Sequence, residues 1–168
     1  MKKFIILTLI VLVIVKANAQ STKFIANPVL DKFVGTWVAK KDKKMIILTI
    51  KKLEITAING VTIEMLEGYH SYKEDRNMID TLTKKPTFTN GSNFSDDAIK
   101  YDDRVFFDFH DKSKQKGGHA VFTLSKTNPE ELSMILSNVE VFLVRKKSDK
   151  PYDMGYTIPI KLVFKKQK

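Results

Sequence analysis

The sequence predicts an all-β protein: a single antiparallel up-and-down β-barrel, with a β-sandwich as the alternative. About nine or ten short segments of alternating polar and apolar residues follow one another between turn signals. No long helical pattern and no repeat of roughly 20–50 residues interrupts them. Residues 33–37, Phe-Val-Gly-Thr-Trp, place a glycine two residues before the only tryptophan, at the start of the first strand. This opening favours the barrel, because glycine lets the backbone pass tightly while the indole covers the open end.

The N-terminus predicts a secretory signal peptide, residues 1–19. Two lysines precede an apolar run at residues 4–15, and a small-x-small sequence ends at Ala19, before Gln20. The apolar run is short for a membrane span and no stop-transfer sequence follows it, although an uncleaved anchor is the alternative. We therefore expect cleavage between Ala19 and Gln20, no stable membrane span afterwards, and a periplasmic or secreted protein.

The composition fits one exported domain, residues 20–168. The chain has no cysteine, so neither disulfides nor a lipid-modified cysteine are available and stability must come from the core. Loss of three lysines with the signal peptide lowers the formal net charge from +10 to +7. The lysines are scattered in short pairs at strand ends and turns, which favours a solvated surface over a nucleic-acid groove. No nucleic-acid partner is expected.

Local signals place the strands and turns. The apolar phase slips by one at Lys51-Lys52, which predicts a β-bulge. Asn59-Gly60 between apolar residues predicts a hairpin. Residues 83–103 are rich in Pro, Gly, Asn and Asp and predict a long loop, where function often lies. Alternation over residues 156–164 predicts the final strand, and Pro159 favours an edge or a barrel seam for it.

Several stretches resemble known families. Gly35-Thr36-Trp37 resembles the Gly-x-Trp signature of lipocalins and related calycin barrels. The chain lacks the cysteine pair of many lipocalins and a helix before its last strand, so retinoid-type binding does not carry over. The fuller pattern is similar to an uncharacterised domain-of-unknown-function family of small exported flavobacterial proteins. Residues 33–37, 66–72, 80–82 and 158–162 carry it. This resemblance implies export and a β-rich domain, and it implies no catalytic residue.

Aromatic side chains are the candidates for lining a ligand cavity inside the barrel. The cavity would need a barrel wide enough to stay partly empty, and ordinary core packing is the alternative. The candidates are Trp37, Tyr69, Phe107, Phe109 and Phe122.

A metal site is a weaker hypothesis. Asp108 and His110 share one strand parity, and His119 could return across the following hairpin. The alternative places all three on the outer face, opposite Phe107 and Phe109. Four aspartates at residues 96–103 could offer oxygen ligands to calcium, but they lack the EF-hand spacing and fit a solvated loop better.

Catalysis has the least support, and the sequence leans towards a protein that is not an enzyme. Glu64 and Glu67 lie three apart on a strand and therefore on opposite faces. No Gly-x-Ser-x-Gly, no cysteine nucleophile and no phosphate loop is present. No cofactor is expected.

One modification site is suggested. Asp80-Thr81-Leu82 resembles the short Asp-Thr-aliphatic acceptor that flavobacterial proteins use for O-glycosylation in the periplasm, which would place a sugar on Thr81.

Together these features predict an exported, lipocalin-like barrel that binds a small apolar or amphipathic ligand without catalysis. The alternative is a protein that interacts with an envelope protein, or inhibits one, through loops at residues 83–103 and 144–155. A hydrolase of envelope polymers is a distant third. The sequence sets no oligomeric state.

Overall fold

A computed structural model describes residues 23–41, 43–74, 77–80, 85–94, 99–138 and 155–167. Its elements, in chain order, are β1 (Lys23–Ile25), the 3-10 helix η1 (Pro28–Lys32), β2 (Gly35–Lys41), β3 (Lys44–Thr56), β4 (Val61–Glu74), β5 (Asn77–Asp80), β6 (Phe88–Ser92), β7 (Arg104–Asp111), β8 (Lys116–Leu124), β9 (Glu131–Asn138) and β10 (Lys161–Lys166).

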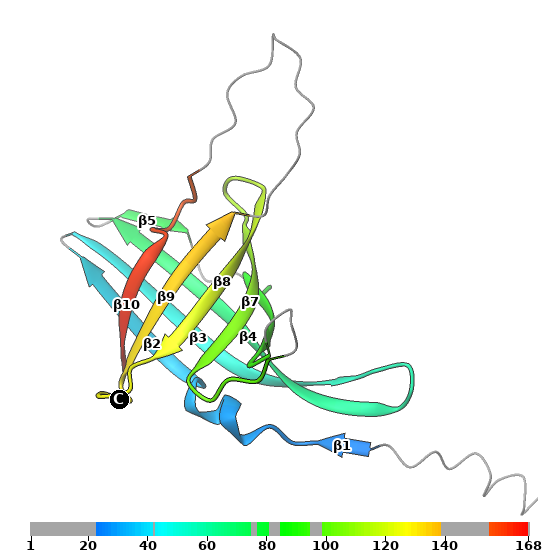
Figure 1. The fold of residues 1–168 in the computed structure, drawn as a ribbon. Coiled ribbons are helices and arrows are strands. Elements are labelled where there is room, and N and C mark those ends of the chain that lie inside the picture. Colours follow the sequence, from blue (N-terminus) through cyan, green and yellow to red (C-terminus); the bar gives the residue numbers. More distant parts are fainter. Residues whose placement is uncertain are drawn as a thin grey trace, which may run out of the picture.

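The strands form a closed antiparallel barrel (Figure 1). Eight of them pair in the order β4-β3-β2-β10-β9-β8-β7-β6, and β6 returns to β4 to close the ring. Apart from the β6–β4 and β10–β2 pairs, every pair in the ring joins two strands that are consecutive in the sequence. The predicted up-and-down barrel is confirmed, and the sandwich alternative is not what forms. Within the described residues, no helix is long and apolar enough to cross a membrane.

Two short strands lie outside the ring, both paired with β4. β1 runs parallel to β4, with Lys23 opposite Val61 and Ile25 opposite Ile63. β5 pairs antiparallel with the other end of β4 and joins it through a register shift. The sequence offered no clear signal for β1, because three exposed residues carry no periodicity.

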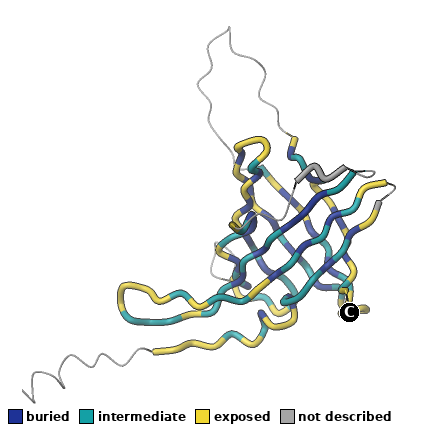
Figure 2. Tube along the Cα trace, turned by 180° about the vertical axis from the view of Figure 1, so that it is seen from behind, coloured by how far each residue is buried: buried dark blue, intermediate teal, exposed yellow. Residues whose placement is uncertain are grey.

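One parity of each barrel strand faces inward and fills the interior. In β7 to β9 buried residues alternate with more exposed ones, as the pleat of a half-buried sheet requires. Figure 2 shows these buried positions crossing the barrel wall, whereas the hairpin that leaves the barrel is mostly exposed or half-buried. The largest fully buried side chains are Trp37, Phe33, Phe88, Phe122 and Phe164, together with six aliphatic residues and Met134.

Trp37 lies near the start of β2, and we call this end of the barrel the Trp37 end. Its ring is fully buried, and its Nε1 donates a hydrogen bond of 2.8 Å to the carbonyl oxygen of Phe33. Gly35 has φ +134°, a conformation that L side chains rarely adopt. Gly35 therefore adopts a conformation that suits glycine, and the indole is buried with a partner for its N–H.

The predicted bulge at Lys51-Lys52 is wrong. β3 and β4 pair without a register shift from Lys44 opposite Glu74 to Thr56 opposite Thr62. The alternation of apolar residues changes parity because the β3–β4 hairpin projects beyond the barrel wall after Ile50 (Figure 1). In the projecting part, the opposite face of β3 is the one that is partly buried. The predicted turn is confirmed: the Gly60 amide donates to the Ala57 carbonyl at 2.9 Å, and Gly60 has φ +77°.

Two further boundaries need correction. Residues 83–103 are not one long loop, because β6 lies within them and closes the barrel by pairing with β4 and β7. Both pairings of β6 are irregular, which explains why its sequence lacks clean alternation. The final strand begins only at Lys161. Residues 155–160 instead cross the end of the barrel opposite Trp37, with Tyr156 and Ile158 buried; we call this the Tyr156 end.

Candidate functional site

Four of the five aromatic cavity candidates form the packed interior. Phe107 and Phe122 have ring centroids 5.3 Å apart, and Phe88 lies 4.8 Å from Phe109 and 5.3 Å from Phe122. A Cβ added at Gly91 would lie 2.2 Å from Cε1 of Phe107, so the Phe107 ring already lies against the neighbouring strand β6. Phe107, Phe109 and Phe122 therefore pack together around Phe88, and Trp37 is buried in the same core, so a ligand among the phenylalanines would have to displace rings.

The fifth candidate, Tyr69, lies on the outer face. Its hydroxyl donates a hydrogen bond of 2.6 Å to Glu67 Oε1, and Lys51 Nζ lies 5.1 Å from the centroid of its ring. The hydrogen bond to Glu67, then burial and the charge of that carboxylate, raise the pKa of the Tyr69 phenol. The inward parity of this strand is that of Leu66, His70 and Tyr72. Tyr69 does not line the interior.

The metal candidates also face outward. Asp108 Oδ1 lies 3.4 Å from His119 Nδ1, and both side chains are about half exposed. The other carboxylate oxygen, Oδ2, accepts a hydrogen bond of 2.7 Å from Asn90. His110 is exposed and pairs across the ladder with Gly117. Among the described residues, no three His, Asp or Glu side chains gather as metal ligands would.

A polar latch holds residues 155–160 over the Tyr156 end. The buried Asp111 carboxylate accepts hydrogen bonds from the Thr157 amide at 2.5 Å and the Thr157 hydroxyl at 3.0 Å. Lys116 Nζ donates to the Gly155 carbonyl and lies 4.5 Å from the Tyr156 ring centroid. Deeper inside, His70 Nδ1 shares a 2.7 Å hydrogen bond with Thr87 Oγ1. These contacts tie residues 155–157 to β7 and β8.

The barrel wall is incomplete between β2 and β10. The two strands are registered at only two positions, Lys165 opposite Val38 and Lys166 opposite Trp37. Yet β10 pairs with β9 from Lys161 to Lys165, and β2 pairs with β3 along its whole length. In Figure 1 β10 runs at an angle to β2 rather than alongside it. The ladder thus opens towards the Tyr156 end, leaving the facing edges of the strands apart.

Two adjoining cavities follow this opening, and we call them together the β2–β10 groove. The first has a volume of about 460 Å³ and is lined by Ala39, Lys40, Ser133, Met134, Ile135, Lys161, Leu162 and Val163. The second has about 520 Å³ and is lined by Val38, Lys40, Val163, Lys165, Lys166 and Gln167. Both volumes lie in the range of small-molecule sites. The first cavity reaches the inward-facing residues Ala39, Met134 and Leu162, so the groove cuts into the wall.

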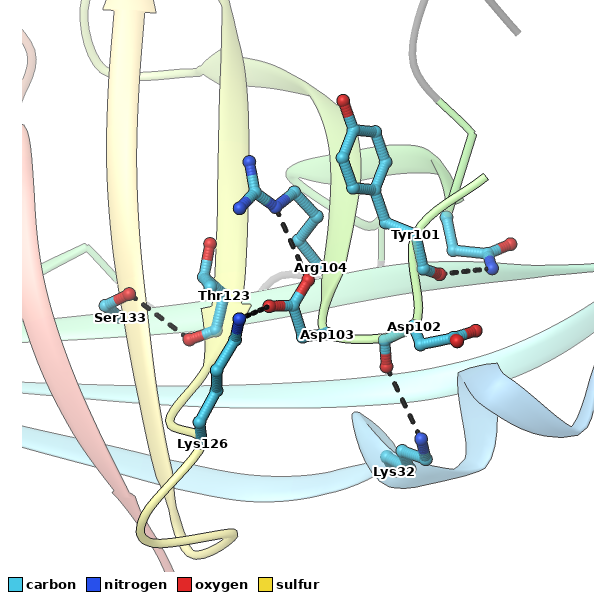
Figure 3. A network of polar contacts seen from close by, with 9 residues as sticks. Lys32, Tyr101, Asp102, Asp103, Arg104, Thr123, Lys126 and Ser133 are labelled. Carbon is cyan, nitrogen blue, oxygen red and sulfur yellow. Dashed lines mark hydrogen bonds and ion pairs between the residues drawn. The ribbon is translucent and has the colours of Figure 1, made fainter. Parts of the chain in front are cut away.

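A separate depression lined by several lysines lies at the Trp37 end, and Figure 3 shows its polar contacts. Its cavity of about 430 Å³ is lined by Lys32, Lys126 and Lys166, but also by Asp102 and Asp103. Asp103 forms ion pairs with Arg104 at 3.5 Å and Lys126 at 3.9 Å. Because Asp102 and Asp103 line the same depression, their carboxylates largely neutralise its positive charge.

A separate ion-pair cluster fixes η1 against the projecting hairpin. Lys52 Nζ lies 2.5 Å from Asp31 Oδ1 and 3.2 Å from Glu64 Oε1, while Glu64 Oε2 accepts the Asn27 amide at 2.6 Å. The hydrogen bond to Asp31 is the largest influence and raises the pKa of Lys52, against the opposing effect of burial. This cluster links η1 to β3 and β4 and is structural.

Some sequence-based expectations fall outside the described residues. They are the signal cleavage site at Ala19 and Gln20, the acceptor Thr81, two of the loop aspartates, and most of residues 144–155.

Fold and groove together define a class: a closed, lipocalin-like β-barrel with an aromatic-rich core and a ligand-sized groove in its wall. The chain belongs to a family of unknown function, DUF6705, whose model matches residues 1–167. Comparisons with the curated proteins and with the solved structures give no match.

Sequence reasoning missed the residues of the groove. A signal was present: Ile135 and Val163 are apolar residues on the outward parity of their strands, and Val163 lies between Lys161 and Lys165. An outward apolar residue between two lysines marks an amphipathic surface. Only the pairing of β10 with β2, far apart in sequence, shows that this surface borders a gap.

Proposed function

We propose that this protein binds a small apolar or amphipathic molecule in the β2–β10 groove and does not transform it. The observation that carries the proposal is the early end of the β2–β10 ladder, beside a cavity that reaches Ala39, Met134 and Leu162. Exposed strand edges and apolar surface at one place are costly unless something covers them. A bound apolar chain would cover the apolar surface.

The groove is a better site than the barrel interior for a physical reason. Phe88, Phe107, Phe109 and Phe122 contact one another in the core, and losing the packing of one aromatic side chain costs several kcal/mol, about 3–5. The groove already exists and needs no such displacement. Val163 and Ile135 are 55% and 51% exposed, so apolar surface is available there at no cost to the core.

Native mass spectrometry tests the proposal. Residues 20–168, purified gently from an expressing bacterium, should carry extra mass that leaves on denaturation. Refilling of the emptied protein is then measured with an apolar fluorescent dye in titration. A protein that carries no extra mass and binds no dye would overturn the proposal.

A variant pair locates the site. Ile135→Asp with Val163→Asp should weaken dye binding about tenfold or more, because two charges would then lie on the apolar wall of the groove. Ile58→Asp is the matched control, since Ile58 is fully exposed at the tip of the projecting hairpin and should leave binding unchanged. If both proteins bind the dye as tightly as the unaltered chain, the groove is not the site.

We also propose that the protein is exported, with cleavage after Ala19, and carries a sugar on Thr81. The sequence patterns described above support both proposals. Intact-mass measurement on protein from its native host checks them together. The account expects a chain beginning at Gln20 with added mass that maps to a peptide containing Thr81. A chain that retains residue 1 would overturn export by this route, and an unmodified Thr81 peptide would overturn glycosylation.

Among the described residues, nothing favours the loop-mediated alternative. Its main segment, residues 83–103, contributes β6 to the barrel wall, and Asp102 and Asp103 are engaged at the Trp37 end.

A further inference from the structure

We propose that the ligand of the β2–β10 groove is an anionic amphiphile, with its negative head group held between Lys40 and Lys161. This inference rests on the proposed function and specifies the chemistry of its ligand. The head group is a carboxylate or phosphate attached to an apolar chain, and it could come from a free molecule or from the surface of a lipid bilayer.

The two lysines flank the gap. Lys40 is carried by β2 and Lys161 by β10, and both line the cavity of about 460 Å³. Both are exposed. Among the described residues, no carboxylate is found within ion-pair distance of either ammonium group. The charge on each side of the gap is therefore available to a ligand.

The lining contains no acidic residue. Neither cavity of the groove is lined by Asp or Glu. One carboxylate lies close by, since Glu131 is the cross-strand partner of Lys165. For that reason we assign the head group to Lys40 and Lys161 and not to Lys165. The basic depression at the Trp37 end lacks this property, because Asp102 and Asp103 line it.

Apolar surface adjoins the lysines on both sides of the wall. Val163 follows Lys161 at the next outward position of β10, and Ile135 is the cross-strand partner of Lys161 on β9. Leu162 and Ala39 border the same cavity from the inward side. An apolar chain can thus lie in the gap while its head group stays at the solvent-facing lysines, the arrangement that snorkelling lysines favour.

Two probes of equal chain length separate the head group from the tail. Dodecanoate and dodecanol are titrated against residues 20–168 at neutral pH in competition with the apolar dye. The proposal expects dodecanoate to bind about tenfold more tightly, and expects this preference to shrink when salt rises from about 50 mM to about 500 mM.

Charge reversal then tests the two lysines. Lys40→Glu with Lys161→Glu should remove the preference for dodecanoate while dodecanol binding changes less than about threefold. The matched control is Lys23→Glu with Lys100→Glu, which makes the same change in net charge at two exposed lysines away from the groove. The control should keep the preference.

The possible results separate the choice of head group from ligand binding in the groove. Equal binding of both probes, unchanged by Lys40→Glu with Lys161→Glu, would overturn the head-group inference and leave the proposed function standing. Binding of neither probe, together with no extra mass in native mass spectrometry, would overturn both. Loss of the preference in the control pair as well would mean that net charge, and not the groove, selects the ligand, and would overturn the inference.

A final comparison identifies the source of the head group. The protein is sedimented with vesicles of phosphatidylcholine alone and with vesicles containing phosphatidylglycerol. Binding to the anionic vesicles that is lost in Lys40→Glu with Lys161→Glu would assign the head group to a bilayer lipid. Dodecanoate binding without vesicle binding would assign it to a free amphiphile. If Lys40→Glu with Lys161→Glu alters neither interaction, the inference is wrong.

Discussion

At the scale of the residue, Gly35 and Trp37 decide how the barrel is closed at one end. Gly35 holds a positive φ, and a Cβ there would lie 3.0 Å from Cε of Lys166. The Lys166 ammonium in turn lies 5.0 Å from the centroid of the Trp37 ring. The glycine therefore makes room for a cation over the indole. The sequence motif predicted the turn and the buried indole, but the lysine comes from the other end of the chain.

Gly35→Ala should destabilise the protein by about 1–3 kcal/mol, because it combines backbone strain with a close contact to Lys166. The free energy of unfolding, measured by urea denaturation, checks this. Gly117→Ala is the control: its added Cβ would meet nothing nearer than 4.0 Å, and we expect a change below about 0.5 kcal/mol. Equal losses in the two variants would contradict the role given to Gly35.

Tyr69 was predicted to face the barrel interior, and it lies on the outer face instead. In the projecting part of β4, Ile63 and Met65 carry the apolar parity, and continuing that parity leads to Tyr69. Once the strand enters the barrel wall, the opposite parity faces inward. Nothing local marks the position where the hairpin joins the wall, so the face of Tyr69 could not be assigned from sequence.

At the scale of the element, residues 155–160 are held by Asp111 and Lys116, which flank the turn of the β7–β8 hairpin. Their sequence alternates like a strand, and the prediction of a strand from residue 156 follows from that. Pro159 provides no backbone donor, and the buried carboxylate of Asp111 captures the Thr157 amide instead. Whether residues 155–160 join a β-ladder or bind the end of the barrel therefore depends on Asp111, more than forty positions earlier in the sequence.

Asp111→Ala should release this segment. The Thr157 amide would lose its acceptor, so its hydrogen exchange should speed up at least about tenfold, with a loss of stability of about 1–3 kcal/mol. Hydrogen-exchange mass spectrometry of peptides covering residues 155–160 makes the measurement. Asp108→Ala, on the same strand but facing outward, should leave this exchange unchanged. Unchanged exchange in Asp111→Ala would contradict the latch.

The Lys52 cluster predicts a pH dependence. The pKa of Lys52 is raised in the folded protein. The ion pairs therefore contribute their full stabilisation below the unfolded lysine pKa of about 10.4, and this stabilisation is lost as the pH rises through the folded pKa of Lys52. Lys52→Met should cost about 1 kcal/mol at pH 8, and its difference from the unaltered chain should shrink above about pH 10.4. Urea denaturation at several pH values checks it. A constant difference across that range would contradict the assignment.

At the scale of the whole molecule, the fold class was predictable and the site was not. Alternation in consecutive strands specifies an antiparallel barrel, because each strand needs only its neighbours. The groove depends on the one junction that joins the first and last strands of the ring, and there the ladder ends after two pairs. Its position follows from the inclination of β10, which no local pattern encodes. The sequence directed attention to the aromatic interior, where the structure places Phe88, Phe107, Phe109 and Phe122 in contact with one another.

The most direct test of this account is a two-dimensional ¹⁵N–¹H NMR titration of residues 20–168 with dodecanoate, chosen because it locates binding without assuming a site. The account predicts that the largest amide shifts occur at Ala39, Lys40, Ile135, Leu162 and Val163, on both edges of the gap. Largest shifts at Val105, Phe107, Phe109 and Phe122 would instead place the ligand in the barrel interior, and would contradict the claim that the groove is the binding site.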